Sequence, residues 1–166
     1  MHTVTAEYPV QLEKSEVWLL LRDLSKPDMY VQGLTAVEFT TSQRIGVGTS
    51  RRVTQGKFMQ LDETVTQWIE GNGFTLRLHR GDKGPIPPFS SHFFDYGVVQ
   101  RGDQVYLRNS MRWEVGLGPL GALLNSLVLK RLLSTQLHKV TLAQKIYYQT
   151  GERVTPEILK AAEQVQ

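Results

Sequence analysis

The chain has 166 residues, of which 40% are hydrophobic and 21% charged, so we expect one folded domain rather than a disordered chain. It contains no cysteine, which excludes disulfides, thiolate metal ligands and cysteine nucleophiles. Its 19 Lys and Arg against 16 Asp and Glu give a net charge of +3, well short of the strongly basic composition typical of nucleic-acid-binding domains.

The N-terminal part of the chain predicts a strand followed by one or two short helices. Thr3–Val10 is rich in β-branched and aromatic residues, as strands are. Ser15 occupies the position of a helix N-cap, and Pro27 either ends that helix or opens a second one. The first helix is indicated by apolar residues at helical spacing, which are Val17, Leu20, Leu21 and Leu24.

Six further strand-like segments follow, separated by turns that contain glycine. These segments are Thr35–Ser42, Thr49–Gln55, Met59–Glu70, Phe74–Arg80, Phe89–Gln100 and Gln104–Val115. Their close spacing leaves no room for crossover helices, so we expect the strands to form an antiparallel sheet.

The last large element is predicted to be one long helix that covers a face of this sheet. Pro119 suits its first turn, and Gly151 suits its end. Thr155 and Pro156 then suit the start of a short tail helix. The apolar stripe of the long helix consists of Leu120, Leu123, Leu124, Leu127, Leu132, Leu137, Val140, Ala143 and Tyr147.

The sequence therefore predicts an α+β fold, with a seven-stranded antiparallel sheet packed against a long C-terminal helix. We expect residues 1–152 to form this domain and residues 153–166 to form the tail helix. The chain starts without the basic and apolar segments of a signal peptide, and it has neither cysteine nor an N-x-S/T acceptor. On these grounds we expect a cytoplasmic protein.

The positions of two turns predict which side chains face the long helix. If Gly102-Asp103 is a two-residue turn, the inner face of its hairpin carries His92, Phe94, Tyr96, Val98, Leu107, Asn109, Met111 and Trp113. If Asn72-Gly73 is the centre of the preceding hairpin (or Gly71-Asn72, one residue earlier), the inner face carries Leu61, Glu63, Val65, Gln67, Ile69, Phe74, Leu76, Leu78 and Arg80. These turns do not determine the register of the segment Arg51–Thr54.

Polar side chains interrupt this otherwise apolar inner face at six positions. Burying such a group without a partner would cost about 2–7 kcal/mol on transfer scales. Either the groups pair in a filled core, for example Glu63 with Arg80 and Tyr96 with Asn109, or they line a cavity that holds a small molecule. The number of polar groups on one face favours the cavity; they are Glu63, Gln67, Arg80, His92, Tyr96 and Asn109.

Three segments carry a resemblance to a known superfamily, within a match that spans about Thr3–Glu152. They are Ser15-Glu16-Val17-Trp18, Gly46-Val47-Gly48-Thr49-Ser50-Arg51 and Gly118-Pro119-Leu120-Gly121. With the order of elements, they resemble the helix-grip fold of the START/Bet v 1-like (SRPBCC) superfamily, particularly its polyketide cyclase/dehydrase and lipid-transport branch. The resemblance implies a curved sheet that holds an apolar ligand against the C-terminal helix, and it carries over no catalytic residue.

Other motifs point to no cofactor, metal or nucleic acid. Gly116–Gly121 satisfies G-x-G-x-x-G, but no strand follows it as a dinucleotide site requires. The four histidines lack metal-ligand spacing. The acid-free stretch from Val115 to Gly151 is either a solvated helix face or a basic face that makes weak peripheral contact with an anionic membrane; its cations are Lys130, Arg131, Lys139 and Lys145.

These observations leave two main functions, and a third, a membrane-associated quinone or lipid chaperone that uses the basic helix, overlaps the first. The first is non-catalytic binding or transport of a small hydrophobic molecule, such as a lipid, an isoprenoid or an aromatic polyketide. The second is an enzyme of the polyketide cyclase/aromatase type, in which His92 moves protons near neutral pH and Tyr96 donates to a developing enolate oxygen. The predicted ligand-binding residues are Glu63, Gln67, Arg80, His92, Tyr96, Asn109 and Trp113.

Overall fold

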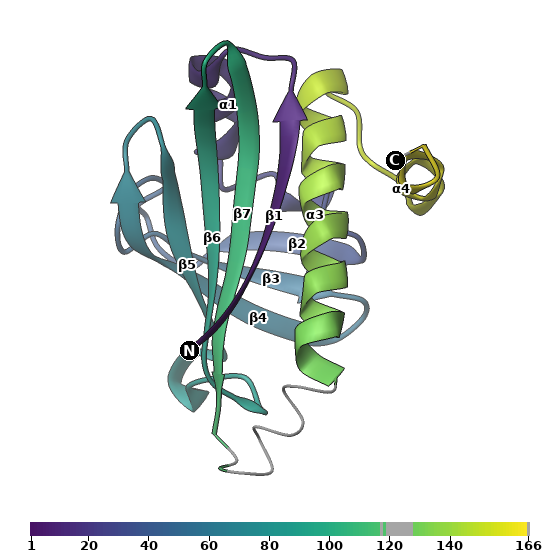
Figure 1. The fold of residues 1–166 in the computed structure, drawn as a ribbon. Coiled ribbons are helices and arrows are strands. Elements are labelled where there is room, and N and C mark those ends of the chain that lie inside the picture. The colour runs from purple at the N-terminus through teal and green to yellow at the C-terminus, as the bar shows by residue number, and fades with distance from the viewer. Residues whose placement is uncertain (117, 119–127, 166) are drawn as a thin grey trace.

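A computed structural model describes residues 1–116, 118 and 128–165, and it confirms the predicted α+β fold (Figure 1). In this described part, seven strands form one antiparallel sheet in the order β1-β7-β6-β5-β4-β3-β2. The strands are β1 (His2–Val10), β2 (Leu34–Phe39), β3 (Ser50–Gln55), β4 (Met59–Ile69), β5 (Gly73–His79), β6 (Phe89–Arg101) and β7 (Gln104–Val115). The helices are α1 (Lys14–Leu21), the 3₁₀ turns η1 (Pro27–Met29) and η2 (Gly81–Lys83), α3 (Lys130–Thr150) and α4 (Pro156–Glu163).

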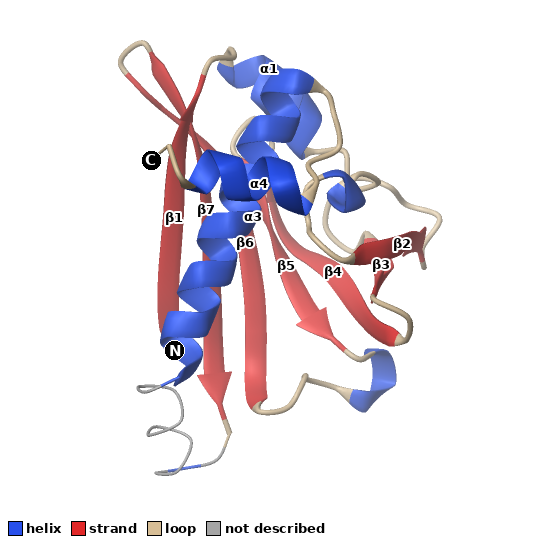
Figure 2. Ribbon diagram, turned by 90° about the vertical axis from the view of Figure 1, so that its right-hand side faces the viewer, coloured by secondary structure: helices blue, strands red, loops and turns tan. Residues whose placement is uncertain are grey.

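The sheet curves around α3, which lies along β1 and β7 at one side of the concave face (Figures 1 and 2). The short helix α4 crosses the C-terminal half of α3 (Figure 2). Strands β2 to β5 extend away from α3 on the other side of the sheet. One helix therefore covers only part of the concave face, and the remainder is where the cavity described below lies.

The hairpin of β6 and β7 has the predicted register. His92 pairs with Trp113, Tyr96 with Asn109, and the pairing continues to the turn at Gly102-Asp103. The inner face of this hairpin is buried, as predicted, whereas its outer face carries an ion pair between Arg112 and Asp95.

The predicted register of the β4–β5 hairpin is wrong. Ile69 pairs with Gly73, so the loop comprises residues 70–72, and a β-bulge lies between Val65 and Gln67. A bulge adds one residue to its strand and therefore reverses which side chains face inward beyond it. Gln67 and Ile69 consequently lie on the outer face, where Ile69 is 61% exposed, and Trp68 packs inward instead.

The helix ends within the described residues lie where the sequence predicts them, except at the start of α1. Helix α1 begins after Glu13 rather than Ser15, and the Glu13 amide donates to the Glu16 carboxylate at 2.9 Å. Gly151 ends α3 in the left-handed conformation, and Thr155 caps α4 by accepting a hydrogen bond from the amide of Ile158. No described helix is long and apolar enough to cross a membrane.

The apolar stripe of α3 is described only from its later members. Leu137 and Ala143 are fully buried, whereas Leu132 is 50% exposed. The expected first turn at Pro119, the first four leucines of the stripe and most of the glycine motif Gly116–Gly121 lie outside the described residues.

A buried amide joins α3 to the centre of β7. Asn109 Nδ2 donates to Gln144 Oε1 at 2.7 Å and to Thr141 Oγ1 at 3.2 Å, and all three side chains are completely buried. The Gln144 amide in turn donates to the hydroxyl of Tyr148 at 2.9 Å. Because hydrogen bonds have directional geometry, this network holds α3 against β7 and also sets the position of α3 along that strand.

We expect Asn109→Ala to lower the free energy of unfolding by about 1–3 kcal/mol, because it leaves the Gln144 and Thr141 oxygens buried without their donor. Urea denaturation measures the loss. The exposed amide of Gln100 is the matched control, and Gln100→Ala should change stability by less than about 0.5 kcal/mol. Equal effects of the two substitutions would contradict the role assigned to Asn109.

Candidate functional site

A cavity of about 1080 Å³ lies between the sheet and helices α3 and α4. Its walls are mainly apolar, and its volume is at the upper end of those found for small-molecule pockets. Apolar side chains from seven elements line it, including Val53, Leu61, Leu78, Phe94, Met111, Leu133 and Leu159. The predicted cavity between the sheet and the C-terminal helix is therefore present in the structure.

Four polar side chains meet in the cavity wall, and we call them the polar cluster: Tyr30, Arg51, Glu63 and Tyr96. Arg51 and Glu63 are directly opposite each other on β3 and β4. Arg51 Nε donates to Glu63 Oε2 at 2.7 Å, and Nη2 lies 2.6 Å from the same oxygen. Arg51 Nη1 also donates to the carbonyl oxygen of Leu24, so the guanidinium is held from both sides.

The polar cluster is buried, and the pKa values of three of its members are shifted. Arg51 is only 2% exposed; burial acts to lower its pKa, but its interactions with Glu63, Tyr96 and Tyr30 together raise it by more. Burial raises the pKa of Tyr30 to about 12 and that of Tyr96 well above its ordinary value. At neutral pH both tyrosines therefore keep their protons beside a neutralised ion pair.

His92 lines the cavity apart from this cluster. It is 7% exposed, its ring packs against the tilted ring of Phe89 with the centroids 4.6 Å apart, and neither ring nitrogen has a hydrogen-bond partner among the described residues. Burial lowers the pKa of His92 to about 4. The ring is therefore neutral at pH 7, and its two nitrogens, one a donor and the other an acceptor, are buried in the cavity wall.

Four of the seven predicted ligand-binding residues line the cavity: Glu63, Arg80, His92 and Tyr96. Arg80 is exposed at the rim, where it donates to the carbonyl oxygens of Pro85 and Lys83. One interpretation of the sequence paired Glu63 with Arg80. In the structure the ion-pair partner of Glu63 is Arg51 instead.

Three of the predicted residues do not line the cavity. Gln67 faces outward because of the β4 bulge, and its Oε1 accepts a hydrogen bond from Thr75. Asn109 faces inward, but it donates to α3 rather than pairing with Tyr96. Trp113 is fully buried beside His2, with the ring centroids 5.8 Å apart.

Sequence reasoning missed Arg51 and Tyr30. A signal for Arg51 is present, because a three-residue loop at residues 56–58 pairs Gln55 with Met59 and thereby places Arg51 opposite Glu63. Tyr30 follows η1 and belongs to no strand, and only the folded chain brings it to the other three residues.

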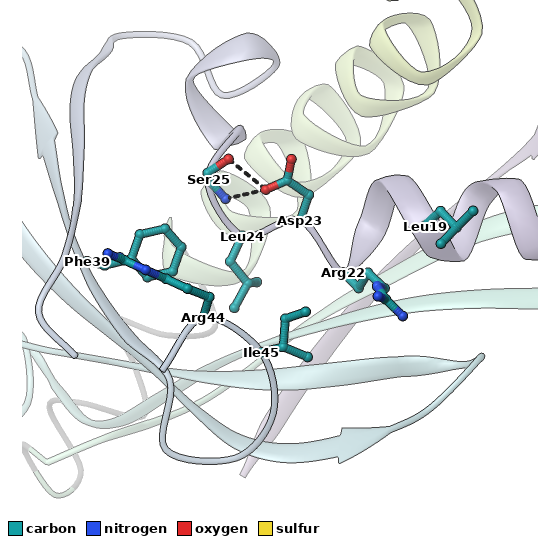
Figure 3. A pocket seen from close by; sticks show the side chains of 8 residues that line it. All are labelled: Leu19, Arg22, Asp23, Leu24, Ser25, Phe39, Arg44 and Ile45. Carbon is teal, nitrogen blue, oxygen red and sulfur yellow. Dashed lines mark hydrogen bonds between the residues drawn. The ribbon is translucent and has the colours of Figure 1, made fainter. Parts of the chain in front are cut away.

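A second, smaller pocket of about 380 Å³ lies between the end of α1 and the segment that follows β2 (Figure 3). Its polar groups already have partners: Asp23 accepts hydrogen bonds from the amide and hydroxyl of Ser25, and the Arg44 guanidinium lies 4.2 Å from the centroid of the Phe39 ring. In the described part of the chain, no group of three or more side chains could ligate a metal. The large cavity is therefore the candidate site.

No protein-family model matches the chain, and no curated protein matches its sequence. Solved structures match it as folds. TTHA0849 from Thermus thermophilus is 17% identical with a TM-score of 0.62, over 97% of this chain and 99% of that one. Norcoclaurine synthase from Thalictrum flavum, in complex with dopamine and hydroxybenzaldehyde, is 16% identical with a TM-score of 0.66, over 87% and 84%.

Ara h 8.0201 is 14% identical to this chain with a TM-score of 0.63, over 89% of this chain and 97% of that one. Low identity over nearly the full length of each protein means that these likenesses concern the fold and not particular side chains. TM-scores of 0.62 to 0.66 over most of each chain show a shared fold, and the chain therefore has the Bet v 1-like helix-grip fold that its sequence resembles.

Proposed function

We propose that this protein binds a small, largely apolar molecule, such as a lipid, an isoprenoid or an aromatic polyketide, in the cavity between its sheet and helix α3. The observation that carries the proposal is the cavity itself, which encloses about 1080 Å³ within mainly apolar walls. Each Å² of apolar ligand surface buried there would contribute about 25 cal/mol. The complex of norcoclaurine synthase with two small aromatic molecules supports the proposal, because it holds them on the same fold.

Helix α4 belongs to this proposed site. Leu159 is buried and lines the cavity together with Pro156. The connecting segment is fixed by hydrogen bonds, since Val154 donates to the carbonyl of Met29 at 2.9 Å and accepts from Gln32 at 2.7 Å. The tail, residues 153–166, would thus form part of the binding domain's wall rather than a separate unit.

The alternative, a cyclase-type enzyme that uses His92 and Tyr96 as an acid/base pair, has less support. The two residues are four positions apart on β6, which corresponds to about 13 Å along a strand, and Phe94 lies between them on the same face. A histidine whose pKa is about 4 is also unprotonated at neutral pH and cannot serve there as the general acid.

The binding proposal is tested by filling the cavity. Leu78 and Arg77 are neighbours on β5, but Leu78 lines the cavity and Arg77 is exposed on the other face. We expect Leu78→Trp to weaken binding of the neutral fluorescent probe N-phenyl-1-naphthylamine at least about tenfold, because the indole occupies the space that the probe needs. Arg77→Trp should leave the affinity unchanged within about twofold.

The titration is read from the increase in probe fluorescence, with far-UV circular dichroism and thermal melting to show that each variant is folded. Absence of saturable binding to the unmodified protein, or equal affinity in the two variants, would refute a ligand site in the cavity. Native mass spectrometry of the purified protein complements the titration by detecting any apolar molecule that copurifies.

Acidification should destabilise the protein through His92. Its pKa is about 4 when folded against 6.5 when unfolded, so the unfolded chain binds more protons between these values. The free energy of unfolding therefore falls as the pH decreases from 6.5 to 4, by up to about 3 kcal/mol from this residue. We expect His92→Phe to reduce the pH dependence measured by urea denaturation, whereas His138→Gln, at an exposed position on α3, should retain it.

A further inference from the structure

The polar cluster has a composition that selects among ligands. Arg51 and Glu63 form a close ion pair inside the wall, so the pair as a whole carries no net charge. The two phenols beside it retain their protons at neutral pH, and each therefore has one O–H group to donate. The hydroxyls of Tyr30 and Tyr96 interact with each other, and this satisfies at most one of the two donors.

An ionised ligand group would be poorly accommodated at this position. A carboxylate placed beside Arg51 would also lie close to Glu63, and in a poorly solvated wall like charges repel strongly. An ammonium group near Glu63 would meet Arg51 in the same way. Moreover, the Arg51 guanidinium already donates to Glu63 and to the carbonyl of Leu24, so it is held in place rather than free to turn toward an anion.

A neutral oxygen suits the cluster better. A carbonyl oxygen has two lone pairs and can accept the remaining phenolic O–H without bringing charge into the wall. The surrounding side chains of the cavity, such as Val53, Leu61 and Phe94, would bury the apolar remainder of such a molecule. Both tyrosines are held by neighbouring rings: Tyr30 stacks on Tyr147 with the centroids 6.0 Å apart, and Tyr96 stacks on Phe94 at 4.3 Å.

We propose that the polar cluster of Tyr30, Arg51, Glu63 and Tyr96 binds a neutral carbonyl oxygen of an otherwise apolar ligand, with the tyrosine hydroxyls as donors and the ion pair fixing their surroundings. This inference rests on the proposed binding function and specifies the chemical class of its ligand. The polar cluster thereby distinguishes ketones, quinones and similar neutral carbonyl compounds from hydrocarbons and from carboxylates of the same shape.

Three probes of nearly equal size test the inference: 2-acetylnaphthalene, 2-isopropylnaphthalene and 2-naphthoate. Their affinities are measured by displacement of N-phenyl-1-naphthylamine from the unmodified protein and from Tyr96→Phe and Tyr30→Phe, which keep the rings and remove the hydroxyls. Since the hydrocarbon is intrinsically more hydrophobic, the informative quantity is the change in each affinity on substitution, as in a double-mutant cycle.

We expect at least one of the two substitutions to weaken binding of the ketone about fivefold to tenfold, the value of one hydrogen bond, and to change binding of the hydrocarbon less than about twofold. The naphthoate should bind the unmodified protein at least about tenfold more weakly than the ketone. Tyr106→Phe is the matched control, because Tyr106 lies on the outer face of β7 and does not line the cavity, and it should affect no probe.

The outcomes separate the two proposals. If all probes bind but neither substitution distinguishes the ketone from the hydrocarbon, or if the naphthoate binds best, the assignment of the polar cluster is wrong and the cavity remains a binding site. If no probe binds in a manner that Leu78→Trp abolishes, the proposed function fails and this inference fails with it.

Discussion

The structure depends on where α3 is held over the sheet. Asn109 fixes the helix to β7 through two hydrogen bonds in a fully buried setting, while an α-helix with its side chains is only about 10–12 Å wide. Seven strands spaced by about 4.8 Å span about 29 Å between the edge strands. One helix held at β1 and β7 cannot cover such a face, and the curvature of the sheet turns the uncovered part into a cavity.

The buried ion pair in the cavity wall is better explained by specificity than by stability. Removing two charges from water costs several kcal/mol per ion, and such a pair is often no more stabilising than well-packed apolar residues of the same volume. Arg51 and Glu63 nevertheless occupy directly opposed positions on the neighbouring strands β3 and β4, with two phenols beside them. Apolar residues would suffice if this wall served only for packing. Polar groups at these positions suit a wall that orients the polar end of a ligand.

His92 is a further polar residue in the cavity wall, and its properties differ from those of the polar cluster. Its nitrogens have no partner among the described residues, and burial keeps the ring neutral. A buried polar group without a partner destabilises a folded protein, and His92 is such a group in the cavity wall. The polar cluster and His92 thus lie at separate points of one apolar chamber, with Phe94 between His92 and Tyr96 along β6.

The sequence by itself determined the elements, the β6–β7 register, the C-terminal end of α3 and the start of α4, because each depends on local chemistry: a two-residue turn at Gly102-Asp103, a left-handed Gly151 and the Thr155 cap. It also indicated the cavity through polar residues on an apolar face. Only the tertiary structure decided the β4 bulge, which lets Trp68 pack between Trp18 and Phe74 and turns Gln67 outward. The tertiary structure likewise brought Tyr30 to Arg51, because contacts between residues distant in sequence depend on how all the elements pack together and leave no pattern in any one segment.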